Sequence, residues 1–219
     1  MRRTYAALAA ALAAALAVPA AAPAMISEVG VIPPTTPPTT ASCPTHCLAV
    51  SRTTGFQVKV QKVSNPLGMP RAGTIVAWTI SLGKPSAAQI KFFNEHEGGA
   101  SEAGIAILRP VNTHLSYRLI GQSPPTKLEK FFGKTAQFPL ETTIPVRKGD
   151  IVALTVPTWA PALALGFGND TSWRAARQKK QCSETSSLTT HTTLGSPVTY
   201  YCLYQTARLT YSATLISTP

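Results

Sequence analysis

The residues best suited to bind a charged partner form one basic segment late in the chain. The segment carries the cations Arg174, Arg177, Lys179 and Lys180. No acidic residue lies between Asp170 and Glu184. Such a cluster attracts polyanions, including anionic cell-wall polymers, lipid headgroups and extracellular DNA, and it contacts phosphates without reading any base. The alternative interpretation is a solvated loop on a generally basic protein.

Two tryptophans are candidates for stacking against a sugar ring. Trp159 stands between Pro157 and Pro161, and Trp173 directly precedes Arg174. An exposed indole packs well against the apolar C–H face of a sugar, so both residues are predicted to join the basic segment in a binding surface. The alternative for each tryptophan is a buried plug at one end of the core.

The sequence offers little material for catalysis or metal binding. The whole chain has 9 Asp+Glu, and neither a Gly-x-Ser-x-Gly nor a His-Glu-x-x-His motif occurs. Residues 95–97, Glu-His-Glu, stand beside two glycines and are expected to form a solvated loop tip rather than a metal site. Glu102 and Glu141 could cleave a glycoside only if the fold joined them. We therefore assign no catalytic residue, metal ligand or cofactor.

The cysteines predict disulfide bonds. The chain has 4 Cys, and an even count in an exported protein implies bridges, for which three pairings are possible. We expect neighbours in sequence to pair, Cys43 with Cys47 and Cys182 with Cys202. The second bridge would restrict the unfolded chain by about 3 kcal/mol in the loop-entropy model. A four-cysteine zinc site is the alternative, although the chain lacks Cys-x₂₋₄-Cys motifs on both sides of such a site.

Residues 1–24 have the pattern of a secretory signal. Two arginines precede a short Ala/Leu run, and small residues offer a cleavage site between Ala22 and Ala24. A membrane anchor is the alternative, but the run is shorter than the ~20 residues that a span needs. Loss of Arg2 and Arg3 would lower the formal charge from +11 to +9. We expect a secreted or envelope-associated protein without a later transmembrane segment.

Residues 25–42 are predicted to form a disordered spacer, because they contain the Pro/Thr repeat of residues 33–40. Residues 43–219 are predicted to form a single domain, which suits the length of one all-β unit.

The dominant pattern in residues 43–219 is a period of two, which is typical of strands. In residues 73–82, for example, Val76, Trp78 and Ile80 are expected on one face. Turn residues recur about every ten positions, which indicates an all-β, antiparallel two-sheet sandwich of jelly-roll type. Residues 90–93 are among the shorter predicted strands, and only residues 126–134 are expected to form a turn of helix. A turn near Gly149 and Asp150 should feed a buried strand.

Four segments resemble a family of uncharacterised secreted β-sandwich proteins from actinobacteria. They are residues 75–85, 154–164, 170–175 and 206–213, and the likeness extends over most of the chain from about Cys43. The resemblance implies an exported sandwich and no assigned activity.

These observations favour an exported, non-catalytic β-sandwich that binds a glycan or an anionic cell-envelope polymer. A metal-independent extracellular hydrolase and a structural surface protein are the alternatives. Specific recognition of nucleic acid is not expected. The ligand and the oligomeric state do not follow from the sequence.

Overall fold

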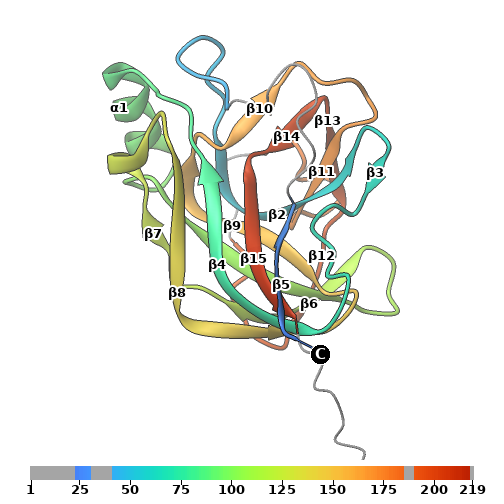
Figure 1. Ribbon diagram of the computed structural model, residues 1–219. Helices are drawn as coiled ribbons and strands as arrows, with labels where there is room; N and C mark the ends of the chain where they lie inside the picture. Colours follow the sequence, from blue (N-terminus) through green and yellow to red (C-terminus); the bar gives the residue numbers. More distant parts are fainter. Residues whose placement is uncertain (1–22, 31–40, 185–189, 218–219) are drawn as a thin grey trace, which may run out of the picture.

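The computed structural model describes residues 23–30, 41–184 and 190–217 of the chain. The fold is all-β and antiparallel, as predicted, with two main sheets (Figure 1). The expected signal lies almost entirely outside the described residues, and so do residues 31–40 of the expected spacer.

The smaller main sheet has four strands. Its spatial order is β1 (Met25–Val29), β15 (Tyr211–Ser217), β4 (Gly73–Ser81) and β8 (Thr135–Val146). The prediction that residues 25–42 form a spacer is therefore wrong at its start. Met25 stands opposite Ser217, and Val29 is 6% exposed, because the short run Met25–Val29 pairs with the last strand and covers its edge.

The larger sheet contains nine strands. Its main path is β12 (Pro197–Thr199), β6 (Ser116–Gln122), β5 (Glu102–Pro110), β9 (Ile151–Ala160), β2 (Val50–Val60), β11 (Ser172–Ala175) and β13 (Cys202–Gln205). The remaining two are β3 (Val63–Ser64), which pairs with β2, and β7 (Thr126–Lys127), which pairs with β5. A separate two-stranded sheet joins β10 (Leu163–Leu165) to β14 (Ala207–Leu209).

The larger sheet curls strongly, because its two end strands are neighbours in sequence. Only Tyr200 and Tyr201 separate β12 from β13, although these strands occupy opposite ends of the strand order. Three Cα–Cα steps span at most about 11 Å. The two ends of the sheet must therefore approach each other, which gives the sheet the shape of a half-barrel.

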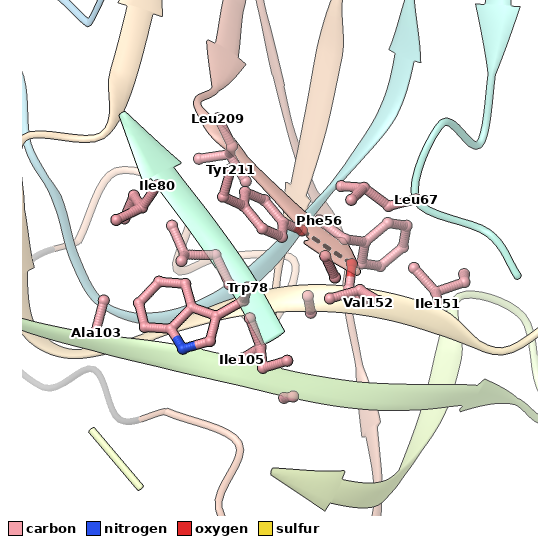
Figure 2. Close-up of a cluster of buried hydrophobic side chains, with 14 of the residues drawn as sticks. Phe56, Leu67, Trp78, Ile80, Ala103, Ile105, Ile151, Val152, Leu209 and Tyr211 are labelled. Atoms are coloured by element: carbon pink, nitrogen blue, oxygen red, sulfur yellow. Dashed lines mark hydrogen bonds between the residues drawn. The ribbon is translucent and has the colours of Figure 1, made fainter. Parts of the chain in front are cut away.

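The core lies between the two sheets (Figure 2). Trp78 and Ile80 of β4 are buried together with Ile105 of β5 and Val152 of β9. The hydroxyl of Tyr211, on β15, donates a 2.9 Å hydrogen bond to the carbonyl of Val152 and so links the sheets. The alternating pattern of the sequence produces this arrangement, since every second side chain of a strand faces the core.

A β-bulge changes the predicted face of β4 at one position. Val76 has no partner in either ladder, because the register shifts between Ile75 and Ala77. Ile75 is 0% exposed, whereas Val76 is only half-buried. The prediction that Val76 shares a face with Trp78 is therefore wrong. The bulge adds one residue to the strand, and Ile75 takes the buried position instead.

One α-helix, α1 (Ala87–His96), replaces the strand predicted for residues 90–93. Ser86 caps the helix: its hydroxyl accepts from the amide of Gln89, while the Gln89 side chain accepts from the amide of Ser86. This reciprocal pair stabilises a helix start. The turn expected within residues 126–134 is the 3₁₀ helix η1 (Glu129–Phe131).

Both predicted disulfides are present, Cys43–Cys47 and Cys182–Cys202. The predicted turn before β9 also forms, with Gly149 at a φ of +87°. Its Asp150 carboxylate accepts a hydrogen bond of 2.8 Å from the amide of Arg147. None of the helices in the described ranges has the length and hydropathy of a membrane span.

Candidate functional site

The basic segment begins in β11, beside β13 at one end of the larger sheet, and continues into the loop that follows β11. Trp173 pairs with Tyr204, and Arg174 pairs with Leu203. Side chains alternate along a strand, so the two pairs face opposite sides of the sheet. The first pair packs ring on ring, with centroids 4.5 Å apart, whereas Leu203 is 43% exposed. Leu203 therefore faces solvent, whereas Arg174 is half-buried and also pairs with the buried Phe56 of β2.

The two arginines of the segment bind internal acceptors. Arg174 Nη1 donates to the carbonyl of Tyr201 at 2.8 Å. Arg177 Nη1 donates to the hydroxyl of Tyr204 at 2.7 Å, and its Nη2 donates to the carbonyl of Ser51 at 3.4 Å. These bonds attach the loop to β13 and β2. The guanidinium groups thus hold the loop in place and have fewer N–H groups left for a ligand.

The two lysines, by contrast, extend into solvent. Lys179 and Lys180 are exposed, and Lys179 Nζ lies 5.9 Å from the ring centroid of Tyr201. The bond between Cys182 and Cys202 fixes the loop beside them. We call Lys179, Lys180, Tyr201 and Leu203 the basic loop surface.

The ion pairs of the described residues lie away from this surface. Within the described residues, the ion pairs are Arg52–Glu97, Lys91–Glu95 and Arg109–Asp150. None of them includes a cation of the basic segment. Exposed cations of this kind attract anions from solvent.

Trp159 does not belong to a surface, which corrects one predicted binding residue. Its side chain is 0% exposed and stacks on Phe93 with centroids 4.8 Å apart. Its Nε1 donates to Asn94 Oδ1 at 2.8 Å and to the carbonyl of Gly99 at 3.0 Å. The alternative interpretation, a plug at the end of the core, is the one that the structure supports.

Trp173 is also an unsuitable platform for a sugar. It is 6% exposed, and Tyr204 covers one of its ring faces. Within the described residues, its Nε1 has no hydrogen-bond partner. Trp173 thus supports the basic loop from beneath and presents almost no face to a ligand. The prediction that it stacks on a glycan is therefore wrong on grounds of burial.

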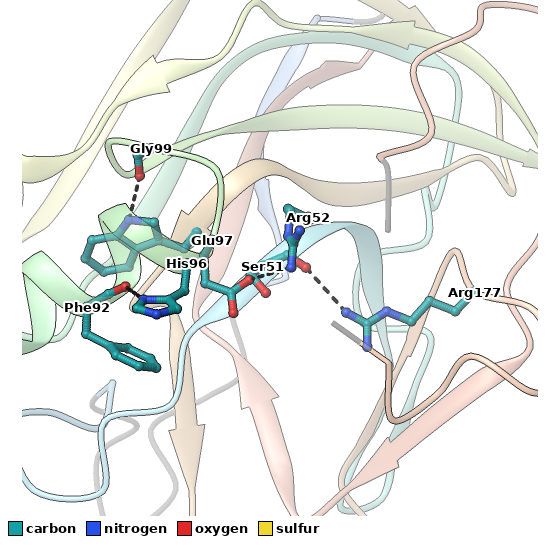
Figure 3. A network of polar contacts seen from close by, with 8 residues as sticks. Ser51, Arg52, Phe92, His96, Glu97, Gly99 and Arg177 are labelled. Atoms are coloured by element: carbon teal, nitrogen blue, oxygen red, sulfur yellow. Dashed lines mark hydrogen bonds and ion pairs between the residues drawn. The ribbon is translucent and has the colours of Figure 1, made fainter. Parts of the chain in front are cut away.

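The end of α1 meets the basic loop through a bulge in β2 (Figure 3). Glu97 pairs with Arg52 at 3.1 Å, and Arg177 binds the neighbouring Ser51. Arg52 has a φ of +41°, at the shift in register between β2 and β9. The ion pair holds the end of α1 against this bulge. Residues 95–97 are hence part of a helix end, and the described residues contain no cluster that could bind a metal.

An exposed aromatic pair on α1 was missed by the sequence analysis. Phe92 is 53% exposed, and its ring stacks on that of His96 with centroids 4.5 Å apart. His96 Nδ1 also lies 2.8 Å from the carbonyl of Phe92. The four-residue spacing of these rings was the available signal, since it places them on one side of a helix.

A largely buried aromatic cluster includes Tyr200, from the chain that links β12 to β13. The rings of Phe56, Tyr117 and Tyr200 have centroids 5.0 to 5.6 Å apart. Burial raises the pKa of Tyr200 well above its usual value, so its hydroxyl stays neutral. Burial also raises the pKa of Tyr117, and the positive charge of Arg174 opposes this rise. The cluster gives the basic loop a rigid backing.

The carboxylates considered for glycoside cleavage lie on different sheets. Glu102 belongs to β5 of the larger sheet, and Glu141 belongs to β8 of the smaller one. No contact between them supports a shared catalytic role.

No family model matches this chain, and no curated protein or solved structure matches it either. The resemblance to secreted actinobacterial proteins therefore remains a prediction.

Proposed function

We propose that this protein binds an anionic cell-envelope polymer through the basic loop surface. The observation that carries the proposal is the pair of exposed lysines, Lys179 and Lys180, on a loop fixed by a disulfide, with no ion pair to any described carboxylate. Exposed cations attract a polyanion over long range and contact its charges directly. A loop that is already ordered loses little entropy on binding.

Tyr201 makes an anionic glycan a suitable form of this polymer. Tyr201 is 37% exposed, and its ring lies beside the ammonium group of Lys179. An aromatic face next to a cation suits a chain that carries both sugar rings and negative charges. This site takes over the role that the sequence analysis gave to the two tryptophans.

The proposed location is outside the cytoplasm. Two disulfides are stable in an oxidising compartment, and the signal-like pattern of residues 1–24 would bring the chain there. Such a location would place the basic loop surface next to the polymers of the envelope.

The test measures retention of the processed chain on immobilised polyphosphate and heparin, with neutral dextran as a control matrix. We expect retention on both polyanions and none on dextran, with release by salt. The double variant K179A/K180A should elute at lower salt. Its slope of log affinity against log salt should fall by about 1 to 2, since each lost phosphate contact contributes roughly 0.7–0.9.

The matched control is K62A/K148A, which removes the same charge from two exposed lysines in turns elsewhere. This variant should elute close to the unmodified protein. Equal losses in both double variants would mean that net charge alone causes retention, and the proposed site would then be rejected.

A further inference from the structure

A cleft opens between the end of β4 and the start of β8, apart from the basic loop surface. Its volume is about 310 Å³. The residues that matter for its chemistry are Ser81, Leu82, Lys84, Lys134 and Thr135, with Cys43 at one wall. This volume lies near the lower end of the range for small-molecule sites, which begins at roughly 300 Å³.

Backbone hydrogen bonds hold the walls of the cleft together. The amide of Leu82 donates to the carbonyl of Lys134 at 3.0 Å, and the amide of Gly133 donates to the carbonyl of Gly83 at 2.9 Å. The amide of Gly83 in turn donates to the carbonyl of Pro161 at 2.8 Å. The cleft is thus formed before any ligand arrives, which lowers the entropic cost of binding.

The third wall is the disulfide-bonded segment Cys43–Cys47. The preceding Ser42 is attached to β10, because its amide donates to the carbonyl of Leu163 at 2.9 Å. The side chain of Gln89, on α1, donates to the carbonyl of Pro44 at 2.7 Å. The segment is therefore fixed from two sides.

Gly133 allows the stem of Lys84 to lie against the backbone of the opposite wall. A Cβ atom at Gly133 would come within 3.1 Å of the Lys84 Cβ. Gly133 also has a φ of +75°, which favours glycine. The absence of a side chain at this position lets the two lysine-bearing segments approach each other.

The cleft is positive and carries two hydroxyl groups. Lys84 and Lys134 both line it, no acid does, and neither lysine belongs to an ion pair of the described residues. Ser81 Oγ and Thr135 Oγ1 lie 2.5 Å apart, and each hydroxyl can both donate and accept. Buried Leu82 adds an apolar surface.

We propose that this cleft binds an anionic molecule the size of one sugar unit. The ammonium groups of Lys84 and Lys134 would neutralise its phosphate or carboxylate, and Ser81 and Thr135 would bind its hydroxyls. The proposal goes beyond polymer binding, because it uses other residues and a concave site. It needs neither lysine of the basic loop surface.

The two sites adjoin the same end of β9. Arg177 of the basic loop binds Ser51, which pairs with Trp159, while Gly83 of the cleft binds Pro161. A chain held at the loop could therefore also be contacted at the cleft, and the experiment has to separate the two sites.

The experiment titrates the ¹⁵N-labelled protein with glucose 6-phosphate, glucuronate and neutral glucose, and follows amide shifts by NMR. We expect shifts around Gly83 and Thr135 with at least one of the anionic probes and none with glucose. The first two probes distinguish a phosphate ligand from a carboxylate ligand. Absence of binding by both anions, or equal binding of glucose, would overturn the proposal.

The variant K84Q/K134Q keeps long polar side chains and removes both charges. We expect it to weaken binding of the anionic probe by about tenfold or more, since it removes charge-assisted hydrogen bonds. K179A/K180A and K62A/K148A should bind the probe as the unmodified protein does. If K179A/K180A lost binding while K84Q/K134Q retained it, the cleft would be rejected and the basic loop surface would be the binding site.

Discussion

Asp150 shows what can be read from a sequence at the scale of one residue. Its position after Gly149 predicted a turn, and its carboxylate does bind the amide of Arg147. The same carboxylate, 1% exposed, also accepts hydrogen bonds of 2.7 and 2.8 Å from Arg109. The hydrogen bond to Asp150 raises the pKa of Arg109. The local sequence is enough to predict the turn. The contact with Arg109 could not be predicted, because it depends on how β5 and β9 pair.

His191 is the titratable residue whose surroundings most clearly depend on the fold. It is 4% exposed; its Nδ1 lies 3.1 Å from the Tyr200 hydroxyl, and its Nε2 lies 3.0 Å from the carbonyl of Ser196. An imidazole protonated at Nε2 alone would donate to the carbonyl and accept from the phenol. Burial lowers the pKa of His191, and the bond to Ser196 opposes this effect.

We predict that acid weakens the fold through His191. Below the ordinary histidine pKa of about 6.5, the unfolded chain takes up a proton that the folded protein resists. The free energy of unfolding should therefore be highest above about pH 7 and should decrease as the pH drops from about 7 to about 5. The measurement is the midpoint of urea unfolding across this range.

The variant H191Q should show a smaller decrease with pH, because its side chain does not titrate. H114Q is the control, since His114 is exposed. An unchanged pH dependence in H191Q would contradict the prediction.

At the scale of elements, long alternating strands were predictable and short or irregular ones were not. Helix α1 was missed because its apolar residues, such as Ile90 and Phe93, also fit a brief strand. The reciprocal pair of Ser86 and Gln89 was a readable start signal. The bulge at Val76 had no local signal, since it depends on the partners of β4.

We predict that β1 is an energetic part of the fold. V29D would place a carboxylate at a position that is 6% exposed, and it should lower the free energy of unfolding by roughly 2–4 kcal/mol. I26D lies on the same strand but at a side chain that is 73% exposed, so it should change this free energy by less than about 0.5 kcal/mol.

Urea denaturation of the two variants and the unmodified protein provides the measurement. Equally small effects of both substitutions would show that the strand contributes nothing to stability.

At the scale of the whole molecule, the class of fold could be predicted from the sequence, but the curl of the larger sheet could not. Alternation and turn spacing are local, and they predict antiparallel sheets. The curl of the larger sheet depends on residues 197–205, which pair with β6 on one side and β11 on the other. The candidate site was likewise predicted only in part. The lysines are exposed, as expected. The burial of the two tryptophans could not be predicted, because it depends on contacts with residues distant in sequence.

The disulfide between Cys182 and Cys202 should stabilise the whole fold. We predict that C182S/C202S lowers the free energy of unfolding by about 3 kcal/mol, because the open chain gains conformational entropy when unfolded. The Cys43–Cys47 bond closes a much shorter loop, so C43S/C47S should lower this free energy by less.

Urea unfolding under non-reducing conditions checks this prediction. The prediction would be wrong if C182S/C202S were as stable as the unmodified protein.

The pairing of β1 with β15 has a consequence for synthesis. The ribosome makes β1 first and β15 last, so the first strand waits for a partner until almost the entire chain exists. Since β15 lies between β1 and β4, a premature stop codon before Tyr211 would leave both of these strands with bare edges. Such a shortened product would carry two open templates for aggregation.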